Sequence, residues 1–162
     1  MHTKTKTTWS KTAMQILETA ASILAEKYLH EHVFCNSQTT KDYLRFKLGG
    51  YDREVFAVML LNSQHELIEF KELFFGTIDA ATVYPREVVK AVLTANASAV
   101  ILTHNHPSGI SEPSQADKLI TQRLVNALGL IDVRVLDHLI IGKTTMSFAE
   151  NNLLPVASTI MN

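Results

Sequence analysis

Cysteine is nearly missing from this sequence of 162 residues, which contains only Cys35. A lone cysteine cannot close a disulfide within the chain, so a disulfide-stabilised scaffold is excluded and a reducing, cytoplasmic compartment is expected. Long apolar runs are missing too, because the longest, at residues 55–61, falls far short of the roughly 20 residues that a membrane helix needs. Residues 1–10 lead into a segment broken by charged side chains, which predicts no signal peptide and no membrane partner.

The sequence also lacks an excess of charge of either sign. Its 15 lysines and arginines nearly balance 16 aspartates and glutamates, which gives a formal net charge of −1. Proteins that bind nucleic acid gain much of their affinity from basic side chains on phosphates, so nucleic acid is a partner without support from the charge. The hydrophobic content of 46% is, by contrast, ample for the core of one compact domain.

Apolar residues recur every three or four positions between residues 13 and 29, with polar residues on the opposite side. This spacing predicts an amphipathic N-terminal helix. A second helix is expected to begin with Ser37 as its cap and to end at Gly49, where glycine suits the C-terminal cap. The chain is therefore divided into an N-terminal helical extension, residues 1–36, and a domain that covers residues 37–162.

From residue 54 onward, short runs rich in Val, Ile, Leu and Phe alternate with helical patterns. We expect strands at residues 54–61, 67–75, 99–103, 133–136 and 139–141, and helices at residues 85–96 and 115–128. Asp137 and His138 either form a polar turn between the last two strands or buttress the cleft of the candidate metal site described below. Strands interleaved with helices predict an α/β or α+β domain in which helices cover a sheet.

The most informative stretch follows the strand at residues 99–103, where His104 and His106 are separated by one residue. Alternate residues of an extended chain point the same way, so both imidazoles can reach one point and bind a metal ion. A loop that contains Pro107 and Gly109 then leads to Asp117, in the first turn of the next helix. Three protein ligands would leave one position for water, whose pKa zinc lowers from about 15.7 toward about 7.

Each part of this pattern also has an explanation without a metal. A His-x-His pair in a loop is a weak signal, and Ser114-x-x-Asp117 is a capping box that satisfies the start of a helix. What favours a metal site is the coincidence of strand, paired histidines, turn and first-turn carboxylate within fifteen residues. A second ligand set, His30, His32 and Cys35, is the weaker candidate because it falls at a helix end, where histidines also pair with free carbonyls.

The order His-x-His-Pro, six residues, Ser-x-x-Asp is complete in this sequence, at His104, His106, Pro107, Ser114 and Asp117. It resembles the JAMM motif of the JAB/MPN metalloproteases. Other segments, spread over most of the chain from about residue 40 to about residue 150, narrow the resemblance to the RadC-like JAB domain. These segments are residues 53–56, 61–62, 73–77, 85–87, 104–109, 113–114 and 137–142.

The resemblance implies a fold similar to that of cytidine deaminases, with a mixed β-sheet flanked by helices. It also implies one zinc ion per chain, held by His104, His106 and Asp117, in a hydrolase that cleaves a peptide or isopeptide bond of a protein substrate. In the JAMM family a glutamate from an early strand deprotonates the attacking water, and Glu54 is the matching position. Ser114 matches the residue that stabilises the oxyanion.

Two alternatives stay open at this stage. Glu87 and Glu112 are rival candidates for the general base, because sequence alone does not place Glu54 near the metal. The alternative function is a non-catalytic module, associated with DNA repair, in which the metal is structural. Longer RadC-type proteins carry a helix-hairpin-helix region, whereas only about forty residues precede the domain here, so a DNA role is the weaker expectation.

Overall fold

The computed structural model describes residues 9–29, 37–79 and 82–158. In chain order, its elements are α1 (Lys11–Leu29), α2 (Ser37–Leu48), β1 (Val55–Leu61), β2 (Leu67–Phe75), α3 (Pro85–Thr94), β3 (Ala99–Asn105), α4 (Gln115–Gly129), β4 (Arg134–Ile141) and β5 (Thr145–Ser147). Within these residues, no helix combines the length and apolar character needed to cross a lipid bilayer. The division of the chain at residue 36 stays a prediction.

The strands form one mixed sheet with the order β2-β1-β3-β4-β5. β1 runs antiparallel to both β2 and β3, whereas β3 and β4 are parallel. Two parallel neighbours need a crossover between them, and α4 supplies it. The prediction of a mixed sheet flanked by helices is therefore confirmed, including the N-terminal helix.

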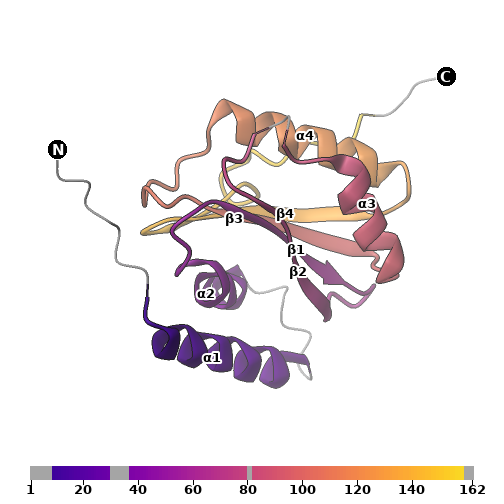
Figure 1. The fold of residues 1–162 in the computed structure, drawn as a ribbon. Coiled ribbons are helices and arrows are strands. Elements are labelled where there is room, and N and C mark those ends of the chain that lie inside the picture. The colour runs from indigo at the N-terminus through magenta and orange to yellow at the C-terminus, as the bar shows by residue number, and fades with distance from the viewer. Residues whose placement is uncertain (1–8, 30–36, 80–81, 159–162) are drawn as a thin grey trace.

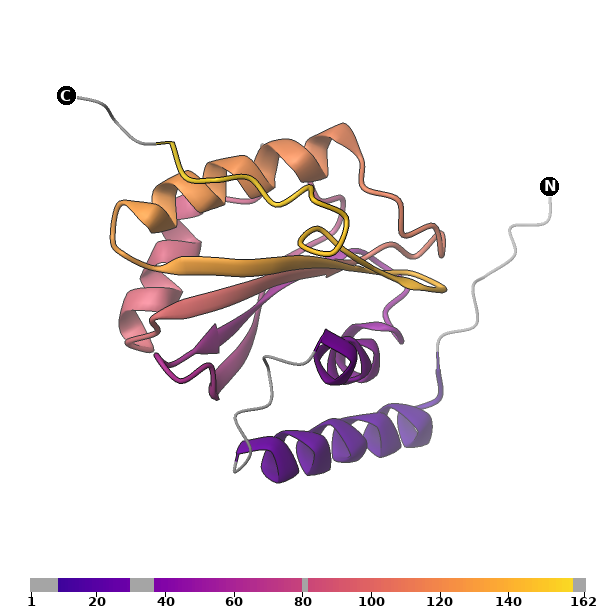
Figure 2. The ribbon, with the colours of Figure 1, turned by 180° about the vertical axis from the view of Figure 1, so that it is seen from behind.

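Helices cover both faces of the sheet (Figure 1). α3 and α4 lie on one face, α2 lies on the other, and α1 packs on α2 (Figures 1 and 2). Because successive side chains of a strand point to opposite faces, β1 contributes to two cores. Phe56, Val58 and Leu60 belong to the core under α3 and α4. The alternate residues of β1 belong to the core under α2.

The end of the sheet differs from the sequence-based expectation. β4 is one continuous strand from Arg134 to Ile141, so the turn expected at Asp137 and His138 is wrong. The polar Asp137 is tolerated there because its carboxylate accepts hydrogen bonds from the backbone N–H of Ala149 and the hydroxyl of Ser147. A register shift in the β3–β4 pairing lies at this point of the sheet. The short edge strand β5 was not expected.

Candidate metal centre

His104 is held in the middle of the sheet, at the end of β3. It pairs with Phe56 of β1 on one side and Ile140 of β4 on the other, and its side chain is fully buried. The Phe56 ring lies nearly parallel to the imidazole, with 6.2 Å between the ring centroids. β3 extends two residues beyond the predicted end at residue 103, so backbone pairing on both sides fixes this histidine.

His106 follows the end of β3 and is held by a tight loop. Its backbone N–H donates to the carbonyl of Ile141 at 2.8 Å, and its carbonyl accepts the N–H of Gly109 at 2.9 Å. Gly109 has a φ of 85°, a conformation that glycine adopts without strain. The Nδ1 atom of His106 lies 2.7 Å from the carbonyl oxygen of Ile110. Because a carbonyl only accepts, Nδ1 carries a proton, so the neutral form of His106 has its lone pair on Nε2, which faces the site.

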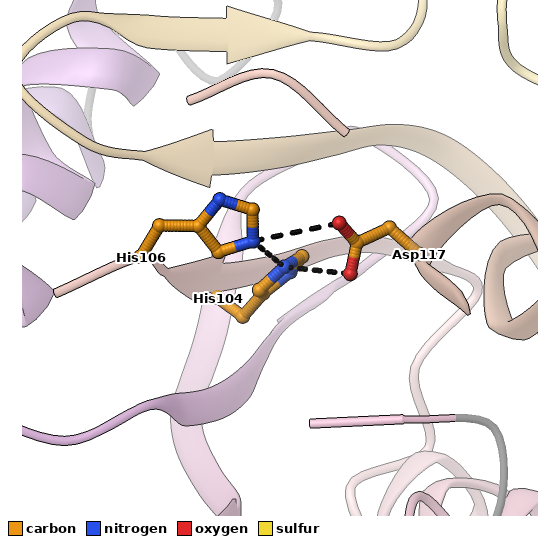
Figure 3. A group of neighbouring side chains, drawn as sticks. All are labelled: His104, His106 and Asp117. Carbon is orange, nitrogen blue, oxygen red and sulfur yellow. Dashed lines mark hydrogen bonds and ion pairs between the residues drawn. The ribbon is translucent and has the colours of Figure 1, made fainter. Parts of the chain in front are cut away.

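Asp117 comes from the first turn of α4, and the predicted capping box is present. The Ser114 hydroxyl oxygen accepts the backbone N–H of Asp117 at 3.1 Å, and the Asp117 carboxylate accepts the N–H of Ser114 at 2.7 Å. The same carboxylate is only 2% exposed and faces both histidines (Figure 3). Capping and participation in the site are therefore compatible, because each carboxylate oxygen has more than one lone pair.

The three side chains converge on one point (Figure 3). The Nε2 atom of His104 lies 3.0 Å from a carboxylate oxygen of Asp117, and Nε2 of His106 lies 3.4 Å from the other oxygen. The two Nε2 atoms are 3.0 Å apart. Two imidazole nitrogens and a carboxylate facing one another attract a cation, and they form a group that could hold a metal ion.

The electrostatics of the group agree with this geometry. Burial alone would raise the pKa of Asp117, but its close contacts with the imidazoles of His104 and His106 outweigh this effect and hold the pKa well below its usual range. The hydrogen bond to Asp117 raises the pKa of His106 against the opposing effect of burial, and the negative charge of Glu54 adds to the rise. The site therefore keeps its carboxylate ionised and favours positive charge beside it.

Glu54 lies immediately before β1 and is held from several directions. Its carboxylate accepts the backbone N–H of Ile78, and its carbonyl accepts the N–H of Gly76. Asn105 holds the residues on either side of Glu54: its side-chain oxygen accepts the N–H of Val55 at 2.7 Å, and its amide donates to the carbonyl of Arg53 at 2.9 Å. The residue between the two histidines thus anchors the backbone of the candidate base.

The rival carboxylates occupy other surroundings. Glu87 begins α3 and pairs with Arg86 and Lys90, with N–O distances of 3.3 and 3.4 Å. Glu112 is exposed in the loop before α4. The charge of Glu54 is the one of the three that acts on the pKa of His106. This arrangement favours Glu54, whose role as a base stays a prediction.

Two buried residues behind His104 complete the surroundings of the site. His138 Nε2 lies 2.8 Å from His104 Nδ1, and His138 Nδ1 lies 2.6 Å from the hydroxyl of Thr121. Burial lowers the pKa of His138 well below its ordinary value, and the neighbouring His104 adds to the effect. The sequence analysis considered His138 as a buttress or as part of a polar turn, and it missed Thr121. The available signal was helical spacing, because Thr121 follows Asp117 by one turn of α4.

A cavity of about 290 Å³ opens beside His106, between the N-terminal part of the chain and the loop that follows β3. Its lining includes Trp9, Tyr51, Asp52 and Lys143, so it offers aromatic surface together with charges of both signs. The other predicted ligand set, His30, His32 and Cys35, lies outside the described residues.

The chain matches the family model of the RadC-like JAB domain over residues 34–153. Two relatives from Vibrio cholerae serotype O1, each named UPF0758 protein, are 59% and 62% identical over 140 residues, which cover 86% of this chain and 89% of each relative. A UPF0758 protein of Pseudoalteromonas atlantica is 52% identical over 139 residues, which cover 85% of this chain and 62% of that protein. The five-stranded mixed sheet between helices is consistent with the JAB/MPN fold.

Proposed function

This chain belongs to the RadC-like JAB domain family, and from that premise we propose that it is a zinc-dependent hydrolase that cleaves a peptide or isopeptide bond. The observation that carries the proposal is the convergence of two imidazole nitrogens and one ionised carboxylate, from His104, His106 and Asp117, on one buried point. Such a donor set suits zinc, and three protein ligands leave a coordination position for water or substrate.

The residues present fit the ion. In its neutral form His106 has its lone pair on Nε2, because Nδ1 donates to Ile110, and Asp117 stays ionised. When bound, zinc supplies Lewis acidity, which polarises a carbonyl and lowers the pKa of water toward about 7.

Glu54 is proposed as the general base. It takes a proton from the attacking water and returns it to the leaving nitrogen, so that water and the amide yield a carboxylic acid and an amine. The hydrogen bond from Ile78 orients one carboxylate oxygen of Glu54 and leaves the other oxygen to meet the water. Asn105 limits movement of the backbone that carries this carboxylate.

Ser114 is proposed to donate a hydrogen bond to the carbonyl oxygen as negative charge develops on it. Its cap contact uses a lone pair of the hydroxyl oxygen, because the partner is the N–H donor of Asp117. The hydroxyl proton is therefore available to the substrate while the cap is intact.

A protein or peptide is the proposed partner, and the cavity that His106 lines is the proposed place for part of it. A polypeptide carries both amide dipoles and side chains of either charge, which suits a lining with Asp52, Lys143 and aromatic rings.

The metal site is tested by elemental analysis of purified protein. We expect about one zinc ion per chain in the wild type and almost none in the double variant His104→Ala, His106→Ala. The variant His65→Gln changes a histidine outside the cluster and is expected to retain the metal. Equal, near-zero zinc in the wild type and the double variant would rule out the site.

The base is tested with Glu54→Gln, which keeps the shape of the side chain and removes its basicity. We expect the rate of peptide-bond cleavage, measured as new terminal amines in a peptide pool, to fall by roughly 10²- to 10⁴-fold with zinc content unchanged. Glu87→Gln and Glu112→Gln serve as matched controls and are expected to keep the wild-type rate. A Glu54→Gln variant as fast as the wild type would remove Glu54 from the mechanism. Zinc binding with no cleavage of any peptide or isopeptide would instead favour the non-catalytic module.

A further inference from the structure

A buried chain of hydrogen bonds leads from one candidate metal ligand back to another. It starts at Nδ1 of His104, passes through both ring nitrogens of His138, and continues to the hydroxyl of Thr121. That hydroxyl donates to the backbone carbonyl of Asp117 at 2.6 Å. The chain closes a ring, because the side chain of Asp117 faces the other nitrogen of His104.

The donor and the acceptor of each hydrogen bond in this series follow from the last one, between Thr121 and Asp117. A carbonyl oxygen only accepts, so the single hydroxyl proton of Thr121 is committed to Asp117. The Thr121 oxygen must then accept from Nδ1 of His138. With its proton on Nδ1, neutral His138 presents the lone pair of Nε2 to His104.

We propose that Thr121 and His138 are positioning residues that fix His104 in the tautomer able to bind the metal. The acceptor on His138 keeps the proton of His104 on Nδ1, which leaves the lone pair of Nε2 directed at the site. This inference rests on the zinc site of the proposed function. It assigns a role to two residues that contact neither metal nor substrate.

The surroundings of His138 and Thr121 oppose a reversal of the donors and acceptors in this series of hydrogen bonds. Thr121 and His138 are both fully buried, so water cannot replace a lost partner. Phe148 stacks on the His138 ring at 4.8 Å between centroids, and Phe56 meets its edge at 5.9 Å, which holds the ring plane. If the whole series reversed, the Thr121 hydroxyl would donate to His138 and the backbone carbonyl of Asp117 would lose this donor. The proton of His104 would then be on Nε2, where it blocks the lone pair that a metal needs.

The test removes the Thr121 hydroxyl with Thr121→Val, which has nearly the same shape, and restores it with Thr121→Ser. We expect the zinc dissociation constant, measured by competition with a chromophoric chelator, to rise roughly 10- to 100-fold in the valine variant and to stay close to wild type in the serine variant. ¹⁵N NMR of the histidine side chains reports the tautomer directly. In metal-free wild type His138 favours the proton of His104 on Nδ1, against the Asp117 carboxylate that competes for it at Nε2. In Thr121→Val the population with the proton on Nδ1 should therefore fall.

Thr103→Val is the matched control. The Thr103 hydroxyl is also fully buried, lies next to His104 in the chain, and donates to a β4 carbonyl, that of Leu139, at 2.9 Å. Its loss should destabilise the fold while leaving zinc affinity and the His104 tautomer unchanged. A second variant, His138→Gln, offers an amide oxygen to His104 and should bind zinc more tightly than His138→Leu, which offers no acceptor.

The outcomes separate this inference from the proposed function. The NMR measurement is made on metal-free protein, so it does not depend on zinc binding or on hydrolysis. If His104 has the same tautomer in wild type and in Thr121→Val, the proposed positioning role of Thr121 and His138 is overturned, whatever the zinc affinity. Equal zinc affinity in Thr121→Val and Thr121→Ser overturns it too. Zinc missing from wild type that has the expected tautomer overturns the proposed function instead.

Discussion

The side chain of Asn105 is expected to carry a measurable part of the stability, and we predict the effect of Asn105→Leu. Leucine branches at the same carbon as asparagine but has no polar atoms. Asn105 is 3% exposed, and its oxygen is the acceptor for the N–H of Val55, a residue that is fully buried. Its amide donates to the carbonyl of Arg53, whose residue is exposed.

The size of the effect follows from these two environments. An unsatisfied N–H at buried Val55 costs about 1–3 kcal/mol, because water cannot reach it. The hydrogen bond to the Arg53 carbonyl is only partly buried, so water can replace part of it and this second loss adds less than the first. The free energy of unfolding should therefore fall by about 2 kcal/mol.

The assay is urea unfolding in the presence of a chelator, so that metal binding does not contribute to the measured stability. The midpoint should shift to lower urea with an unchanged slope, because the unfolded surface is the same. Asn151→Leu is the matched control. Asn151 is exposed and its amide donates to the carbonyl of Ser147, so its loss should cost less than about 0.5 kcal/mol.

Asn105→Leu should also slow hydrolysis, since the backbone that carries Glu54 loses its two anchors. Zinc content should stay at the wild-type level. Two results would refute this reasoning: a stability within about 0.5 kcal/mol of wild type, or a rate loss that is fully accounted for by loss of metal.

Two further predictions concern the loop of His106 and the pH. A Cβ atom on Gly142 would meet the carbonyl oxygen of Gly109 at 2.5 Å, so Gly142→Ala should destabilise the protein by about 1–3 kcal/mol and weaken zinc binding. The control Gly129→Ala is distant from the site and should leave the zinc affinity intact. Equal zinc affinities of the two variants would contradict the argument. In the presence of a chelator, the depressed pKa of Asp117 stabilises the folded protein at pH values above 3.8, the ordinary pKa of this carboxyl group. The raised pKa of His106 stabilises it at pH values below 6.5, the ordinary pKa of an imidazole. The contribution of these two groups to the free energy of unfolding should therefore be largest between about pH 4 and 6.5 and fall on either side. If Asp117→Asn has the same dependence of stability on pH as wild type, the prediction is wrong.

The parts of the fold and site that the sequence predicted are those whose cause is local. The capping box at Ser114 is formed by residues three positions apart, and the His-x-His pair by neighbours on one strand. Hydrophobic spacing likewise located α1 and α4 within a few residues of their observed bounds. The convergence of His104, His106 and Asp117 depends on one loop and one helix start, so it could be anticipated.

The parts that the sequence did not predict depend on contacts between distant residues. Asp137 has the character of a turn residue, and only Ser147 and Ala149, brought beside it by the end of the sheet, allow it within β4. Helical spacing places Thr121 one turn after Asp117, but it does not show the contact of the Thr121 hydroxyl with His138, seventeen residues away in sequence. The function of Asn105 depends on Val55, fifty residues earlier.

The position of Asn105 has a consequence for how the candidate base and the metal ligands move. His104 and Asn105 point to opposite faces of β3, so one residue faces the site while the next reaches across to β1. The pairing of Phe56 with His104 fixes the same two strands in register. A slip of one residue would turn both side chains to the wrong faces and disrupt both cores. Glu54 therefore cannot shift along β3 relative to His104 without breaking that pairing. The sheet, and not a flexible loop, sets the distance between the backbones of the candidate base and the candidate metal ligand.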